Sequence, residues 1–141
     1  MPTHQASIKQ SGEKIVDKIK RGDVLEKECP SREILRNVTS KWGVLTLLAL
    51  YGGDSARFSV LRRRVSGISE KMLSQTLQAL EADGFIKRTS YEGVSLHVEY
   101  SLTVMGEEVA ARILELAGWI EVNLSTILEH RRDYKAKNTS S

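Results

Sequence analysis

Residues 57–85, RFSVLRRRVSGISEKMLSQTLQALEADGF, predict two short helices joined by a tight turn. Apolar side chains recur at spacings of three and four in both halves, which places them on one face of each helix. They are Phe58, Leu61 and Val65 in the first half and Leu73, Leu77 and Leu80 in the second. Ser69 is a preferred N-cap residue for the second helix, and Gly84 suits the left-handed conformation that commonly ends a helix.

The outer face of the second helix is polar. Its side chains are hydrogen-bonding groups and one cation, namely Lys71, Ser74, Gln75 and Gln78. Such a set suits base edges and phosphates, so two amphipathic helices with a tight turn favour a helix-turn-helix. On this stretch alone, an ordinary helical hairpin is equally open, because soluble helices usually have polar outer faces.

The segment after the second helix favours the helix-turn-helix over the ordinary helical hairpin. Residues 85–91 are β-branched, aromatic and cationic, Glu92 and Gly93 offer a turn, and residues 97–102 alternate between polar and apolar side chains. This pattern indicates a β-hairpin directly after a candidate recognition helix, which is the winged-helix arrangement. We expect residues 56–58 to add a short third strand beside this hairpin, the wing.

Several short motifs resemble, in order and spacing, those of the HxlR-type winged-helix transcriptional regulators of bacteria. The matching residues are Cys29-Pro30, Lys41-Trp42, Arg57-Phe58, Leu61-Arg62-Arg63, Gly67-Ile68-Ser69, Lys71, Leu73, Gly84-Phe85, residues 98–103 and Gly106. The resemblance covers residues 29–124 and implies a mainly α fold with a small β-hairpin. This fold is a winged helix-turn-helix domain with a long C-terminal dimerisation helix. In the wing, residues 94–96 replace a proline that is common in the family.

Three groups of side chains are candidates for DNA contact: the outer face and leading end of the second helix, the arginines that end the first helix, and the cations of the first wing strand. They are Ser69, Glu70, Lys71, Ser74, Gln75 and Gln78; Arg62, Arg63 and Arg64; and Lys87 and Arg88. We expect the first group to enter the major groove, the arginines to contact phosphates or position the domain, and the wing cations to reach the DNA backbone or the minor groove. Not all three arginines can face DNA, and the two wing cations alternate across their strand, so we expect only one to reach it. For each single cation, a solvated surface charge is the alternative.

Length and charge agree with one DNA-binding domain. The chain has 141 residues and a formal net charge of +3. Residues 29–91 hold ten Lys and Arg against five Asp and Glu, whereas residues 92–141 hold five against eight. This distribution is typical of a protein that binds a polyanion, although a solvated surface could show it too. The sequence has no run of membrane-spanning length and no secretory signal, so we expect a cytoplasmic protein that does not bind membranes.

The last predicted helix begins at the N-cap Thr103 and bears a long apolar stripe. The small domain cannot cover the whole stripe, so we expect part of it to form a dimer interface. The candidate interface residues are Ile113, Leu116, Ile120, Leu124 and Ile127. A homodimer would present two recognition helices about 34–36 Å apart, one turn of DNA, and so match a two-fold operator.

Composition suggests the domain boundaries. Residues 1–28 are expected to form a partly disordered N-terminal extension, in which residues 13–21 could form a short helix. We expect the winged-helix domain, including the dimerisation helix, over residues 29–132 and a flexible tail over residues 133–141. Pro30 suits the first position of the first helix of this domain. The apolar side of this helix is formed by Ile34, Leu35 and Val38. The helix that follows it contains Trp42, Leu45, Leu48 and Ala49; it is apolar all round and should be buried.

Catalysis is not expected, because the sequence shows no constellation of catalytic residues. The three histidines lie in unrelated contexts, and Gly52-Gly53 is a helix stop without the Lys and Ser or Thr of a phosphate-binding loop. We expect neither a cofactor nor a metal. One cysteine excludes a multi-cysteine zinc site, and His97 and Glu99 on one strand face are too few ligands.

Cys29, the single cysteine, is the candidate redox-sensing residue. At the N-terminus of a helix it lies near the positive end of the dipole, which favours the reactive thiolate. Lys27 and Arg32 would add to this effect, and the neighbouring glutamates would oppose it. The resemblance implies a sensing role, because several family members use a cysteine at this place to detect oxidants or electrophiles. An inert, half-buried cysteine is the alternative and stays open.

The sequence therefore predicts a sequence-specific DNA-binding transcriptional regulator, a repressor that binds a two-fold operator in double-stranded DNA as a homodimer. An effector could be a small molecule or an oxidant that acts through Cys29. The alternative from another class is a winged-helix protein-interaction module without specific DNA binding.

Overall fold

The computed structural model of the chain describes residues 26–27 and 29–139, which contain six helices and a three-stranded sheet. The chain forms two compact units, residues 1–40 and 41–141. The boundary thus follows the first described helix, which the sequence had placed in the winged-helix domain. The helix predicted over residues 13–21 lies outside the described residues. None of the described helices is both long enough and apolar enough to cross a membrane.

In the first unit, helix α2 (Pro30–Thr39) begins at a proline, as the sequence indicated. The first helical position tolerates proline because its N–H would have no partner within the helix. Cys29 is the N-cap residue; its backbone is extended, with φ −71° and ψ 124°, and its side chain is half-buried. On the predicted apolar side, Val38 is buried, whereas Ile34 and Leu35 are exposed, contrary to expectation.

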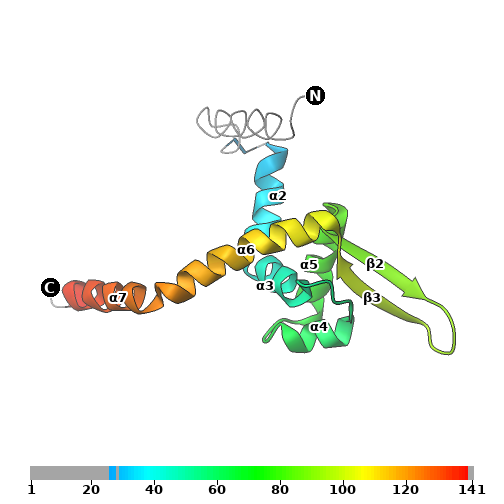
Figure 1. Ribbon diagram of the computed structural model, residues 1–141. Helices are drawn as coiled ribbons and strands as arrows, with labels where there is room; N and C mark the ends of the chain where they lie inside the picture. Colours follow the sequence, from blue (N-terminus) through cyan, green and yellow to red (C-terminus); the bar gives the residue numbers. More distant parts are fainter. Residues whose placement is uncertain (1–25, 28, 140–141) are drawn as a thin grey trace, which may run out of the picture. The chain divides into compact units, whose positions relative to one another are not determined.

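The second unit is a winged helix-turn-helix domain (Figure 1). Its elements are α3 (Lys41–Leu50), β1 (Ala56–Arg57), α4 (Phe58–Arg64), α5 (Glu70–Ala82), β2 (Ile86–Tyr91), β3 (His97–Leu102), α6 (Val104–Val122) and α7 (Leu124–Thr139). Helices α4 and α5 form the helix-turn-helix, and β2 and β3 form the wing. The predicted fold class, mainly α with a β-hairpin, is confirmed.

The core of this unit lies between α3, α4 and α5. Its largest fully buried side chains are Thr46, Leu47, Leu50, Leu61, Leu73, Leu77 and Leu80, and Ala110 of α6 is fully buried as well. The predicted buried face of α5 is therefore confirmed. In α3 the expectation of burial on all sides is wrong, since Leu45 is exposed and burial is confined to Gly43, Thr46, Leu47 and Leu50. Because α3 is apolar on every side, periodicity does not single out its buried face.

The sheet has the strand order β1-β3-β2, and both strand pairs are antiparallel. Arg88 of β2 and Ala56 of β1 both lie opposite Tyr100 of β3. The predicted third strand is present but shorter than expected, because Phe58 begins α4 instead. The wing loop spans residues 92–96 and is longer than the turn expected from the sequence.

The C-terminal helix, predicted as one continuous element, is interrupted at Asn123, which separates α6 from α7. Asn123 has φ −101° and ψ 8°, and its Nδ2 donates a hydrogen bond to the Trp119 carbonyl oxygen at 2.8 Å. Asparagine side chains compete in this way for backbone groups and disfavour helix interiors. Helix α7 continues to Thr139, so most of the segment expected as a tail is helical.

Polar contacts fix the start of α6 to the rest of the unit. Thr103, the predicted N-cap, accepts a hydrogen bond from the Gly106 N–H at 3.0 Å and donates one from Oγ1 to the Gly84 carbonyl oxygen at 2.6 Å. Gly84 has φ +83°, which its predicted role at the end of α5 requires. The end of α5 and the start of α6 are thus joined directly.

Candidate nucleic-acid interface

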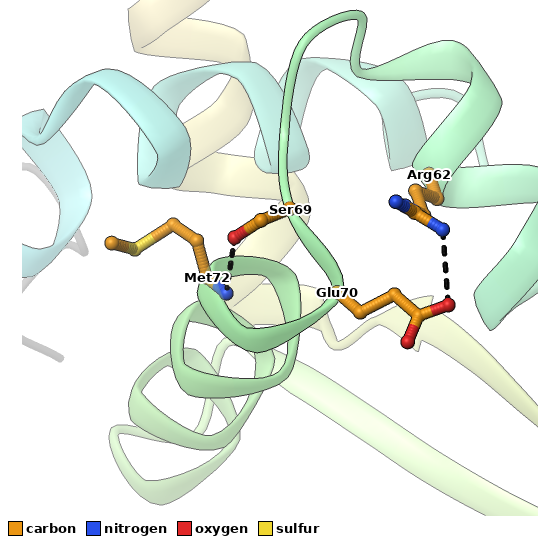
Figure 2. Close-up of polar contacts among 4 residues, drawn as sticks. All are labelled: Arg62, Ser69, Glu70 and Met72. Atoms are coloured by element: carbon orange, nitrogen blue, oxygen red, sulfur yellow. Dashed lines mark hydrogen bonds and ion pairs between the residues drawn. The ribbon is translucent and has the colours of Figure 1, made fainter.

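The turn between α4 and α5 positions the candidate recognition helix α5. Gly67 has φ +89°, a conformation that favours glycine, and buried Ile68 anchors the turn on the core. Ser69 is the N-cap of α5: its Oγ accepts a hydrogen bond from the Met72 N–H at 3.1 Å (Figure 2). Because a hydroxyl both accepts and donates, capping leaves the Ser69 hydrogen available to another acceptor.

The outer face of α5 is polar and accessible. Lys71, Gln75 and Gln78 are exposed, and Ser74 is half-buried. Glu70, Ser74 and Gln78 repeat at a spacing of four, so they form one row along the helix. The structure therefore brings the side chains that we predicted to contact bases together on one helix surface.

The three arginines that end α4 have different surroundings. Arg62 is paired with the first residue of α5, because its Nη1 lies 3.0 Å from Oε1 of Glu70 (Figure 2). Arg64 donates a hydrogen bond from Nη1 to the Ala49 carbonyl oxygen at 3.2 Å, which links α4 to α3. Arg63 is exposed. Arg62 and Arg63, but not Arg64, line a cavity of about 820 Å³ beside the α4–α5 turn.

A recess lies between α5 and the wing. It has a volume of about 420 Å³ and is lined by Ser74, Leu77, Gln78, Glu81, Arg88 and Tyr100. Of the two wing cations, Arg88 thus shares a surface with the predicted base-contacting residues, and Lys87 does not line it. Sequence reasoning missed Glu81 and Tyr100. The strand register, which places Tyr100 opposite Arg88, could have indicated Tyr100 if the length of the wing loop had been known.

The tip of the wing is apolar, since Val94 and Leu96 are exposed. Where the wing loop joins the two strands, the rings of Tyr91 and His97 stack with their centroids 5.0 Å apart. Nε2 of His97 also lies 3.8 Å from Oε2 of Glu99. This His–Glu pair is the one considered as a metal site. Within the part of the chain that the structure describes, no three His, Cys, Asp or Glu side chains gather to hold a metal.

The fold and the polar outer face of α5 define a winged helix-turn-helix transcriptional regulator. The chain belongs to the HxlR-like helix-turn-helix family, whose model matches residues 37–127. A relative from Escherichia coli K12, the uncharacterized HTH-type transcriptional regulator YtfH, is 53% identical over 118 residues, 84% of this chain and 93% of the relative. The predicted family is thereby confirmed, and it consists of transcriptional regulators rather than enzymes.

Solved structures show the same fold. The ytfH structure from Salmonella typhimurium has a TM-score of 0.71 and 55% identity to this chain, and covers 77% of this chain and 96% of its own. The redox regulator HypR in its reduced form has a TM-score of 0.64 and 31% identity, and covers 71% of this chain and 98% of its own. These likenesses confirm the winged helix derived from the helix-turn-helix and hairpin patterns.

Proposed function

We propose that the protein is a sequence-specific repressor that binds a two-fold operator as a homodimer in the cytoplasm. The observation that supports this most is the exposure of Lys71, Gln75 and Gln78 on the outer face of α5, next to the recess that contains Arg88. Side-chain amides contact base edges, and a lysine contacts guanine edges as well as phosphates. A repressor of this kind would place α5 in the major groove and the wing against the adjoining DNA backbone.

The homodimer is supported by an apolar surface on α6 and α7. Beyond the first turn of α6, the large apolar side chains exposed on these two helices are Leu114, Leu116, Trp119, Ile120, Val122, Leu124, Leu128 and Tyr134. A helix pair with so many large apolar side chains in solvent is typical of an interaction surface. Of the predicted interface residues, Leu116, Ile120 and Leu124 are exposed, and Ile113 and Ile127 are half-buried. A second copy of the chain is the proposed occupant, because a two-fold operator requires two recognition helices one DNA turn apart.

A response to oxidants or electrophiles through Cys29 is the finer part of this proposal. It is supported by the N-cap position of the half-buried Cys29 and by the likeness to HypR, a redox regulator solved in a reduced and an oxidized form. Because the chain has one cysteine, a disulfide could form only with Cys29 of another subunit or with a small thiol. If Cys29 is inert, DNA binding is independent of oxidants.

The rival function is a winged-helix module that binds only proteins. DNA fragments selected from a random library by the purified protein, then measured by fluorescence anisotropy, separate the two functions. We expect the selected fragment to resist competition by random DNA. Its affinity should fall roughly a thousand-fold or more between about 50 and 200 mM salt, as for a dimer that neutralises about 6–10 phosphates. A selection that enriches no sequence, with equal affinity for all fragments, would contradict the proposal.

A further inference from the structure

An ion pair joins the two helices of the helix-turn-helix at the leading end of α5. Arg62 belongs to the last turn of α4, and Glu70 is the first residue of α5. Nη1 of Arg62 lies 3.0 Å from Oε1 of Glu70, and the two side chains are 47% and 72% exposed (Figure 2). Both residues line the cavity of about 820 Å³ beside the α4–α5 turn. An acidic side chain thus lies on the surface that, in the proposed function, faces DNA, although DNA is itself a polyanion.

Fold stability alone gives little reason for this pair. Exposed ion pairs stabilise a protein weakly, because water and salt screen the charges and both side chains lose rotational freedom. The position of Glu70 suggests another role. It is the first member of the row that continues with Ser74 and Gln78, and we propose that these two residues contact bases.

We propose that Glu70 accepts a hydrogen bond from the exocyclic amine of a cytosine in the operator, and that Arg62 transfers to a phosphate only when this base is present. The inference rests on the proposed DNA-binding function. A carboxylate accepts hydrogen bonds and cannot donate them. In the major groove its matching partner is the N4 amine of cytosine.

The pair then behaves differently on right and wrong sequences. On a site without the cytosine, Glu70 faces the phosphates with a like charge and keeps Arg62 as its partner. One cation per subunit is thereby withheld from the DNA backbone. On the operator, the cytosine amine replaces the Arg62 guanidinium at the carboxylate, and Arg62 contacts a phosphate. Glu70 thus lowers the affinity for wrong sites more than for the operator, and a repulsive element of this kind raises specificity.

Salt dependence provides a signature of this transfer. The slope of log affinity against log salt grows by about 0.9 for each phosphate neutralised on duplex DNA. The transfer of Arg62 therefore contributes about 0.9 per subunit to the difference between the operator slope and the random-DNA slope. A purely structural role of the ion pair would leave this difference unchanged.

The test uses the full-length protein, an operator fragment selected by it, every single-base-pair variant of that fragment and a random duplex. Affinities are measured by anisotropy over a salt series for the unmodified chain and for Glu70→Ala, Glu70→Gln and Arg62→Ala. Glu108→Gln is the matched control, since it removes one acidic charge from the exposed side of α6. Circular dichroism melting confirms that each variant folds.

We expect Glu70→Ala to bind random DNA more tightly and to lose a preference of roughly tenfold for cytosine at one position of each half-site. Its two salt slopes should approach each other by about 0.9 per subunit. Glu70→Gln should shift the preference at that position to adenine, which a glutamine amide contacts. Arg62→Ala should keep the cytosine preference but reduce the slope difference by the same amount of about 0.9 per subunit, and Glu108→Gln should change neither.

Two outcomes would overturn the inference in distinguishable ways. If folded Glu70→Ala and Glu70→Gln keep every base preference and the original slope difference, the inference is wrong while the regulator function stands. If the unmodified protein does not distinguish its selected fragment from random DNA, the proposed function fails, and the inference fails with it.

Discussion

Oε1 of Glu107 lies 2.9 Å from the backbone nitrogen of Gly53, and Oε2 of the same carboxylate lies 3.3 Å from that of Gly52. One side chain thus accepts two hydrogen bonds from successive amides. Both glycines have positive φ, +102° at Gly52 and +86° at Gly53, a conformation that favours glycine. The contact fixes the first turn of α6, the start of the proposed dimerisation helix, to the loop that ends α3.

This contact should contribute measurably to stability. Glu107→Gln removes the charge that strengthens both hydrogen bonds. We expect the free energy of unfolding to fall by about 1 kcal/mol. The loss is no larger because the contact is exposed to solvent. Urea denaturation followed by circular dichroism measures the change. The adjacent Glu108→Gln is the control and should stay within about 0.5 kcal/mol. Equal effects of the two substitutions would show that the contact does not stabilise the fold.

Substitution of Thr46 should raise the stability of the fold rather than lower it. Its side chain is fully buried in the core, and its Oγ1 has no hydrogen-bond partner among the described residues. A buried hydroxyl without a partner costs about 1–3 kcal/mol, and valine has nearly the same shape without the hydroxyl. We therefore expect Thr46→Val to raise the urea midpoint, by about 1 kcal/mol in unfolding free energy, at constant m-value. A lower midpoint would mean that the hydroxyl has a favourable partner in solution.

The elements that the sequence predicted correctly depend on local chemistry. Ser69 caps α5, Thr103 caps α6 and Gly84 takes a positive φ, each as expected from residue type and spacing. Residue types likewise predicted β2, and alternation of polar and apolar side chains predicted β3. The exception is Asn123, whose own side-chain hydrogen bond interrupts a helix that the apolar stripe had suggested to be continuous.

The features that the sequence did not predict depend on tertiary placement. Nothing in the spacing of Arg62 and Glu70 indicates that the turn brings them to 3.0 Å, because the path of the turn determines that distance. The contact of Glu107 with Gly53 joins residues far apart in the chain. The lining of the recess by Tyr100 depends on the strand register, which the length of the wing loop determines.

The proposed dimer interface predicts the effect of a charge on α6 or α7. Ile120→Asp or Leu124→Asp would place an unpaired carboxylate in the interface, so we expect a monomer or an unfolded chain. Ser125→Asp, which adds the same charge next to Leu124 but outside the predicted stripe, is the control and should leave the dimer intact. Sedimentation velocity at micromolar concentration measures the state. A stable, folded monomer of the unmodified protein would exclude this interface.

The two interpretations of Cys29 differ in reactivity. If Cys29 is a sensor, iodoacetamide should label it at pH 7 faster than a free cysteine, because the helix dipole favours its thiolate. Diamide should then change operator affinity, and Cys29→Ser should abolish that change. Peroxide would oxidise Cys29 through a sulfenic acid to a disulfide with a second subunit or a small thiol, whereas diamide would form that disulfide through a thiol adduct and itself be reduced to the hydrazine. Labelling no faster than a free thiol, together with identical affinities before and after diamide, would identify an inert residue.

The central claim is that the outer face of α5 recognises bases, and the most direct measurement compares specific with random binding after Lys71→Ala and Gln75→Ala. Each side chain is exposed on α5. Anisotropy titrations with the selected operator and a random duplex give the ratio of affinities. We predict that each substitution lowers this ratio, and that Gln75→Ala costs roughly tenfold in operator affinity while random binding changes little. A folded double variant that keeps the full operator preference would contradict the claim and place specificity elsewhere on the domain.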